Sequence, residues 1–321
     1  MHFRRIFLLL FSILMPSFRT SMTLAQALDA NARAREILAQ TRAALGGDAA
    51  LKSVQSLSAL GDFRSGSGTT LASGDVQLDL LLPDKLMRIM KWSPVKDLKV
   101  TTVETMNGSQ IWTDSKEKQS GQALPGNGPG GIGGLGRRGG RGRGSAGSGG
   151  SGQSGTEKGD SAPAPNLRDN GGSQQIFPDF SCITLGLLFH LPDSSKVEAI
   201  PETDDDVGDV TADFVKIDIG HGTVVRLALD QKTHRPVMAA YDIPVEVDGE
   251  RGGEDASGST TTKIQIYFSE YKPIAKKGSG NIWLPHQMTK ARNGLTVEDM
   301  HIKKFQLNPH LKPKQFQQKL S

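Results

Sequence analysis

The chain has 321 residues, a formal net charge of +4 and one cysteine, Cys182. A single cysteine cannot form an intramolecular disulfide, so stability must come from a hydrophobic core, and the length suffices for one large β domain or two small ones. Arg4, Arg5 and Arg19 supply three of the positive charges, and without them the net charge is near +1. The overall charge therefore does not indicate a nucleic-acid-binding protein.

Residues 1–27 have the layout of a signal peptide. Two arginines precede an apolar run, Ile6–Met15, which ends at Pro16, and Ala25-Gln26-Ala27 offers small residues for cleavage. The run is too short to span a hydrocarbon core of about 30 Å. We therefore expect an exported, periplasmic chain that is cleaved after Ala27 or Ala25 and is not an integral membrane protein.

The segment that follows the leader predicts one helix and then five strands. An Ala-rich helix is expected over Asp29–Leu45, with Ile37, Leu38, Thr41 and Leu45 on one side and Gly46-Gly47 as its end. Alternating apolar residues and turn residues such as Pro83-Asp84 and Asn107-Gly108 predict the strands. The expected strands are Val54–Arg64, Thr69–Leu82, Lys85–Trp92, Val100–Met106 and Gln110–Asp114.

A Gly-rich segment, Gly121–Gly172, separates this part from the rest and contains more than half of the chain's 38 glycines. It has almost no large apolar side chains to bury, so we expect it to be disordered. Within it, Gly136–Gly144 (GRRGGRGRG) is similar to the RGG segments that bind RNA, although a solvated low-complexity loop is the favoured interpretation. Gly249–Ser259 resembles a shorter loop of the same kind.

A second helix is predicted after this segment, followed by seven strands. Its apolar stripe has helical spacing, and Pro178-Asp179 and Pro192 mark its two ends. The stripe consists of Phe180, Ile183, Thr184, Leu187, Leu188 and Leu191. The strands are expected at Val197–Ile200, Asp213–Ile219, Thr223–Asp230, Pro236–Val247, Thr260–Tyr271, Ile282–Lys290 and Leu295–Leu307.

The last strand loses its alternation twice, between Leu295/Val297, Met300/Ile302 and Phe305/Leu307. Such slips indicate β-bulges, which bend a sheet. Arg292-Asn293-Gly294 supplies the tight turn before it. The fold class predicted is α+β, mainly β: a curved antiparallel sheet with helices covering the concave face.

No pattern in the sequence indicates catalysis or metal binding. The histidines after the leader lack metal-ligand spacing, and no strand-to-helix nucleophile turn is present. Cys182 lies on the apolar helix and is interpreted as buried and unreactive. An EF-hand loop starting at Asp204 would need its twelfth ligand at Val215, so a solvated acidic turn is favoured there. We expect no enzyme activity and no cofactor.

Turn and strand-end motifs resemble the LolA-like family of periplasmic outer-membrane lipoprotein carriers. In the front half these are Leu45-Gly46-Gly47, Val54–Gly61, Pro83-Asp84-Lys85 and Asn107-Gly108 leading to Trp112; in the back half they are Gly280–Pro285 and Phe305–Pro309, with Phe316 downstream. The resemblance implies a half-barrel built from residues 28–120 and 173–321, with 121–172 as an insertion. It also implies a concave apolar side that is lidded by helices and receives acyl chains.

Seven residues are candidates for lining such a cavity: Leu80, Met90, Trp92, Trp112, Ile183, Leu187 and Leu188. The simpler interpretation of each is an ordinary core position. A carrier that holds lipid or lipoprotein acyl chains is the favoured function. The alternative is a non-enzymatic interaction or scaffold module of the cell envelope, which would use the sheet edge and the flexible loop to bind an envelope protein.

Overall fold

The computed structural model describes residues 19–67, 70–119, 172–191, 194–201, 207–245, 260–276 and 280–318. Residues 121–171 of the expected Gly-rich segment, the loop at 249–259 and residues 1–18 of the proposed leader lie outside these ranges. The helical elements are α1 (Arg19–Ala44), α2 (Asp48–Lys52), α3 (Gly172–Leu188) and η1 (Pro313–Phe316). The strands are β1 (Ser56–Ser67), β2 (Thr70–Leu81), β3 (Lys85–Val95), β4 (Leu98–Asn107), β5 (Gln110–Gln119), β6 (Lys196–Ile200), β7 (Ala212–Gly220), β8 (Thr223–Asp230), β9 (Pro236–Val245), β10 (Thr260–Lys276), β11 (Gly280–Arg292) and β12 (Leu295–Leu307).

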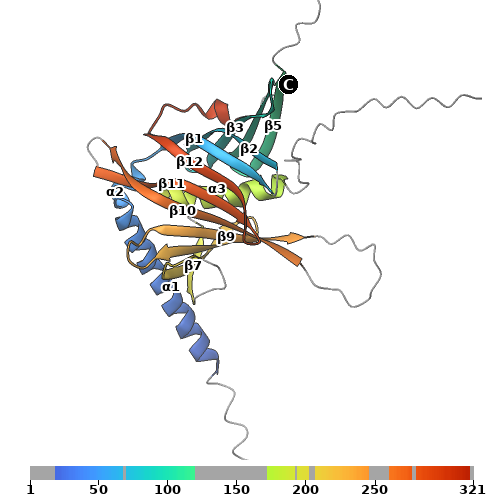
Figure 1. The fold of residues 1–321 in the computed structure, drawn as a ribbon. Helices are drawn as coiled ribbons and strands as arrows, with labels where there is room; N and C mark the ends of the chain where they lie inside the picture. Colours follow the sequence, from blue (N-terminus) through green and yellow to red (C-terminus); the bar gives the residue numbers. More distant parts are fainter. Residues whose placement is uncertain are drawn as a thin grey trace, which may run out of the picture.

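All twelve strands form one antiparallel sheet in the order β5-β4-β3-β2-β1-β12-β11-β10-β9-β8-β7-β6. Neighbours in the sheet are neighbours in sequence except at one place, where β1 pairs with β12. That pairing joins two meanders, β1–β5 and β6–β12, into one open, curved layer (Figure 1). The predicted fold class is confirmed.

The two slips in the last strand correspond to register shifts. One lies between Lys290 and Ala291 in the pairing of β11 with β12, and the other lies between Leu60 and Gly61 in the pairing of β1 with β12. Asn293 and Gly294 make the turn before β12 with positive φ angles of 49° and 79°, as a two-residue hairpin turn requires. Bulges increase the local bend and twist of strands, which helps this sheet to curve.

The helices α1, α2 and α3 pack on different parts of the sheet and contribute to one hydrophobic core. α3 lies across the concave face, where it contacts β4 and β5 of one half and β8–β11 of the other. α1 packs along the edge strand β6, and α2 packs on β11. The turn between α1 and α2 is held against β11, because the Trp283 N–H donates a hydrogen bond to the Leu45 carbonyl at 3.0 Å. Gly46 has φ 128°, and a Cβ there would lie 2.5 Å from the Asn281 carbonyl oxygen, so a larger residue would push this turn off the sheet.

Both helices are longer at their N-terminal ends than the sequence patterns predicted. α1 begins at Arg19, and its expected stripe of Ile37, Leu38 and Thr41 is buried. α3 begins at Gly172, so Pro178 lies inside it and does not start it. The fixed φ of proline is close to the helical value, and the helix loses one backbone hydrogen bond at that position.

Asn308, just past the end of β12, ties the chain's last strand to the start of its first. Its side-chain oxygen accepts from the Gln55 N–H at 2.8 Å, and its amide donates to the Ser53 carbonyl at 3.0 Å. Its own backbone N–H donates to the Ser56 carbonyl at 2.9 Å. Asn308 has φ 52°, which asparagine tolerates better than most residues. The Asn-Pro motif thus closes the two-part sheet.

We expect Asn308→Gly to lower the free energy of unfolding by about 1–3 kcal/mol, because it removes the side-chain hydrogen bonds to Gln55, Ser56 and Ser53 while keeping the positive φ accessible. Chemical denaturation measures the change. Gln306→Ala, at an exposed position of the same strand, is the matched control and should stay within about 0.5 kcal/mol of the parent. Equal stability of the Asn308 variant and the parent would contradict the clamp.

His286 lies where the β11–β12 ladder stops, beyond the pair Gln287 and His301. Its Nδ1 is 2.7 Å from the Ile302 carbonyl oxygen, and because a carbonyl only accepts, Nδ1 carries the proton. Nε2 is buried without a hydrogen-bond partner among the described residues, and the ring meets Phe305 edge-on at 5.1 Å. Burial lowers the pKa of His286 below its ordinary value.

A lowered folded-state pKa means that the unfolded chain binds the proton more tightly, so stability rises with pH through this range. We expect the thermal midpoint to decrease as the pH is lowered from about 7.5 to about 5.5, through the unfolded histidine pKa of about 6.5. His286→Gln should flatten this dependence, and His301→Gln, on an exposed side chain, should preserve it. Identical pH profiles for the parent and the His286 variant would refute the assignment.

Candidate functional site: the concave face beneath α3

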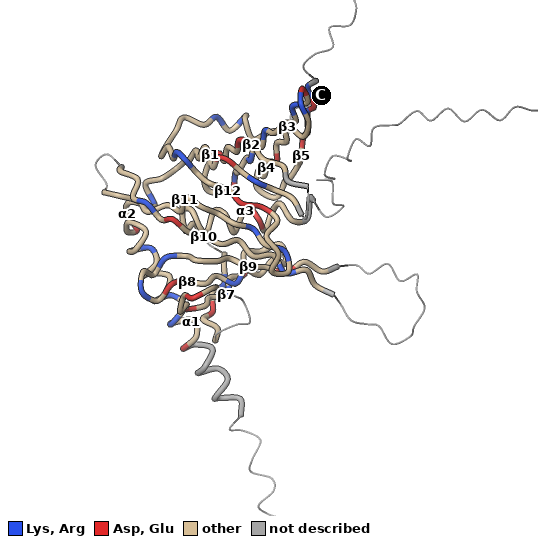
Figure 2. Tube along the Cα trace, in the orientation of Figure 1, with Lys and Arg blue, Asp and Glu red and all other residues tan. Residues whose placement is uncertain are grey.

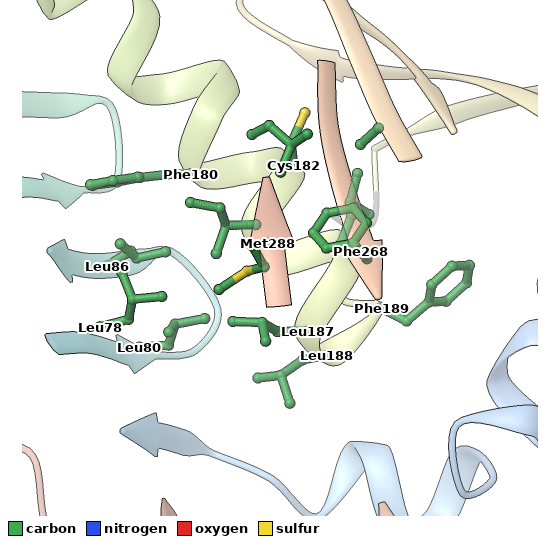
Figure 3. Close-up of a cluster of buried hydrophobic side chains, with 14 of the residues drawn as sticks. Leu78, Leu80, Leu86, Phe180, Cys182, Leu187, Leu188, Phe189, Phe268 and Met288 are labelled. Carbon is green, nitrogen blue, oxygen red and sulfur yellow. The ribbon is translucent and has the colours of Figure 1, made fainter. Parts of the chain in front are cut away.

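The concave face is filled by one continuous hydrophobic core that includes α3. Side chains of Leu78, Leu80 and Leu86 from the first half of the sheet and of Leu187 and Leu188 from α3 belong to the same buried cluster (Figure 3). Phe180, Leu185 and Leu187 are at most 1 % exposed. α3 therefore occupies the groove of the half-barrel with its own apolar side.

Six of the seven residues predicted to line a cavity are in this cluster. They are Leu80, Met90, Trp92, Ile183, Leu187 and Leu188, and each is at most 8 % exposed. Trp112 is not with them. Residues that are directly paired across neighbouring strands share one face of the sheet. Trp112 pairs with Thr105, Thr105 with Met87 and Met87 with Asp79, and this row lies on the face opposite the core. On β5 the residue that packs against the core is Ile111.

A hollow of about 390 Å³, here called the mouth hollow, opens beside the N-terminal part of α3. Ile111 of β5 and the turn between β7 and β8 form two of its sides, and Phe177 and Pro178 of α3 form another. β9 contributes Tyr241 through Pro244. Phe177 meets His221 of the β7–β8 turn edge-on at 4.8 Å. The mouth hollow thus lies where the two ends of the curved sheet approach α3.

A second hollow of about 320 Å³ lies on the other face of the sheet over β1, β2 and β3. Its lining mixes Leu60 and Ile89 with charged side chains, two of which, Asp62 and Lys303, form an ion pair at 2.6 Å. None of the seven predicted lining residues borders either hollow. Over the described strands, acidic and basic positions are interspersed (Figure 2).

Asp179 of α3, which is 2 % exposed, makes a hydrogen bond and an ion pair within the apolar groove. Its Oδ1 accepts from the Tyr241 hydroxyl of β9 at 2.7 Å, and its Oδ2 pairs with Lys290 Nζ of β11 at 2.5 Å. Burial, and then the charge of Asp179, raise the pKa of the Tyr241 hydroxyl, so it stays protonated and donates. These contacts fix α3 to the sheet in one register.

Arg88 of β3 is a second buried charge next to α3. It donates to Glu104 of β4 at 2.6 Å and to Glu298 of β12 at 3.0 Å, and its guanidinium lies 5.8 Å from the centre of the Phe180 ring. Burial opposes the charge of Arg88, but Glu104 and Glu298 outweigh it and its pKa is raised. Arg88 therefore remains charged, and it links both halves of the sheet.

The sequence interpretation missed these charged residues, although both left a signal. Pro178-Asp179 was interpreted as a helix start, but extending the apolar stripe back to Ile176 places Asp179 within it. On β3, Arg88 alternates with Leu86 and Met90 on the buried face. A charge inside an apolar alternation predicts a buried partner.

Cys182 is buried on α3, as expected, and burial followed by the charge of Asp179 raises the pKa of its thiol. Such a thiol is a poor nucleophile because little thiolate forms. Among the described residues no group of three or more His, Cys, Asp or Glu side chains could hold a metal ion. Within the same ranges, no helix has the length and apolarity needed to cross a membrane.

Known proteins resemble the chain in structure but not in sequence. No family model and no curated protein sequence matches it. Three solved structures are similar: a Vibrio parahaemolyticus domain described as an outer membrane lipoprotein-sorting protein, a DUF1329 family protein from Desulfovibrio piger and a LolA superfamily protein from Nitrosomonas europaea. Their identities to this chain are 9 %, 9 % and 12 %, and their TM-scores are 0.41, 0.39 and 0.38. They cover 89 %, 88 % and 89 % of this chain, which in turn covers 97 % of each of theirs.

Gly186 allows α3 to approach the sheet closely. A Cβ at this position would lie 2.2 Å from the Phe268 ring of β10. We expect Gly186→Val to weaken the packing of α3 and to lower the free energy of unfolding by about 1–3 kcal/mol, because the added methyl groups overpack a dense contact. Denaturation by urea measures the loss. A second glycine, Gly208, is not a suitable control position, because its positive φ would strain any valine placed there. The control is therefore Ala39→Val on the exposed side of α1, which should lower the free energy of unfolding by less than about 1 kcal/mol.

Proposed function

We propose that this protein is exported to the periplasm and binds the acyl chain of a lipid or lipoprotein on the concave face of its sheet, without catalysing a reaction. In this proposal α3 is a lid that covers the groove and leaves it when an acyl chain enters. The observation that carries the proposal is the apolar side of α3, which is inserted in the groove between the two halves of the sheet. The mouth hollow supports a route of entry beside the start of α3.

The magnitudes make such an exchange feasible. Undocking α3 exposes six buried large apolar side chains, Ile176, Phe180, Ile183, Leu185, Leu187 and Leu188, at about 1.5–3 kcal/mol each, or about 9–18 kcal/mol in total. Burying an acyl chain of about 15 methylene groups returns about 12 kcal/mol at roughly 0.8 kcal/mol per group. The two amounts are comparable, so an acyl chain can compete with α3.

The alternative of an envelope scaffold that uses a free sheet edge receives less support. β6, at one end of the sheet, is contacted by α1. β5, at the other end, carries Asp114, Lys116, Glu117 and Lys118 in close succession. Charged side chains on an edge strand disfavour pairing with another chain.

A competition between α3 and the acyl chain can be tested with Gly186→Val. If the variant destabilises the docked position of α3 by 1–2 kcal/mol, it should bind an uncharged fluorescent acyl probe about 5–30 times more tightly than the parent, because the open groove is more populated. Fluorescence titration of the full chain measures the dissociation constant. Asn308→Gly weakens the sheet away from α3 and should leave the probe affinity within about twofold.

Two results would count against the carrier. Absence of probe binding by the parent and by the Gly186 variant would refute an acyl site on this face. An equal gain in affinity for Gly186→Val and Asn308→Gly would show that the probe reports general loosening and not release of α3.

A further inference from the structure

Asp179 is the one charged side chain that α3 places against the sheet within the described part of the helix. Both of its oxygens have partners from the sheet: the Tyr241 hydroxyl at 2.7 Å and Lys290 Nζ at 2.5 Å. The neighbouring side chains of the helix, such as Phe180 and Ile183, are apolar and buried. α3 thus presents a carboxylate followed by an apolar stripe, which is also the chemical layout of a long-chain carboxylic acid.

Lys290 of the sheet has its carboxylate partner on α3. Arg88, the other buried cation next to α3, pairs with two acids of the sheet, Glu104 and Glu298. Lys290 pairs with Asp179 of the helix instead. Removal of α3 would leave Lys290 and the Tyr241 hydroxyl without their acceptor on an apolar surface, which is costly.

We propose that Lys290 and Tyr241 form a head-group site for the carboxylate of a long-chain amphiphile, and that Asp179 occupies this site as an internal substitute. This inference rests on the proposed function, since the ligand chain must take the place of α3. A carboxylate restores the hydrogen bond with the Tyr241 hydroxyl and the ion pair with Lys290, whereas an uncharged head group cannot restore the ion pair. A phosphate monoester would bring a second negative charge, which the single charge of Lys290 does not balance.

The site is adjacent to the proposed entry. Tyr241 itself lines the mouth hollow, together with Phe177 and Pro178, which directly precede Asp179 in the chain. A ligand that arrives through the mouth hollow would therefore meet the Tyr241 hydroxyl at the edge of the groove. Its carboxylate could displace Asp179 first, and its chain could then follow the path of the apolar stripe.

The test compares ligands of one chain length on the full-length protein. Laurate, monolaurin and dodecyl phosphate, below their micelle concentrations, compete with a neutral naphthylamine probe. We expect the parent to bind laurate at least about tenfold more tightly than monolaurin or dodecyl phosphate, since a buried charge pair is worth about this much or more. Asp179→Asn removes the internal competitor and should strengthen laurate binding further, with a smaller effect on monolaurin.

Lys290→Met alone leaves Asp179 buried without a cation and could prevent folding, so the decisive variant is the double substitution Asp179→Asn/Lys290→Met. It should bind monolaurin within about threefold of Asp179→Asn but lose the preference for laurate. Lys303→Met, which removes an exposed lysine on the other face, should keep the preference.

The outcomes separate the two proposals. Equal binding of laurate and monolaurin by the parent, or a preference that survives in the double variant, overturns the head-group site while the acyl carrier stands. Tighter binding of dodecyl phosphate than of laurate overturns the assignment to carboxylates. If none of the three ligands displaces the probe, or the probe does not bind, both proposals fail.

Discussion

The packing of α3 against both halves of the sheet is the contact on which the rest of the structure depends. The sheet is open, and its concave side is apolar from β2 across to β10. Without a cover, that surface would be exposed to water along its whole length. α3 supplies the part of the cover that contacts both halves of the sheet, so the state of the groove between them depends on this helix and its few polar contacts.

Those anchors differ in kind from the apolar contacts around them. Apolar side chains favour burial in many alternative positions, but the Asp179 carboxylate must meet Tyr241 and Lys290 together. A buried charge that loses its partner is strongly destabilising, even though an intact buried pair adds little over an apolar contact. The polar contacts therefore select one position of α3, and the apolar surface provides most of the energy of burial.

Local patterns in the sequence were sufficient to predict most of the elements. Each strand was indicated by two-residue alternation and by turns such as Asn293-Gly294, and the slips in Leu295–Leu307 predicted the two register shifts in the pairings of β12. The pairing of β1 with β12 has no local signal, because the partners are far apart in the chain. The same is true of the contact from Asp179 to Tyr241, which are separated by 62 residues. For Trp112, the sequence marked the strand, but the adjacent Ile111 and Trp112 left open which of them faces the core.

The join between β1 and β12 also determines when the sheet can be completed. The hydrogen bond from Gln55 to Asn308 joins residues that are 253 positions apart in the chain. Nearly the whole chain must therefore be synthesised before β1 can pair with β12. The fold is therefore one of high contact order, which slows folding and leaves one edge of β1 unpaired during synthesis. The closure entropy depends only on the logarithm of loop length, so the roughly fifty residues between β5 and α3 add about 0.2 kcal/mol to closing this loop. A long insertion at that point is thus compatible with a sheet that is completed by its last strand.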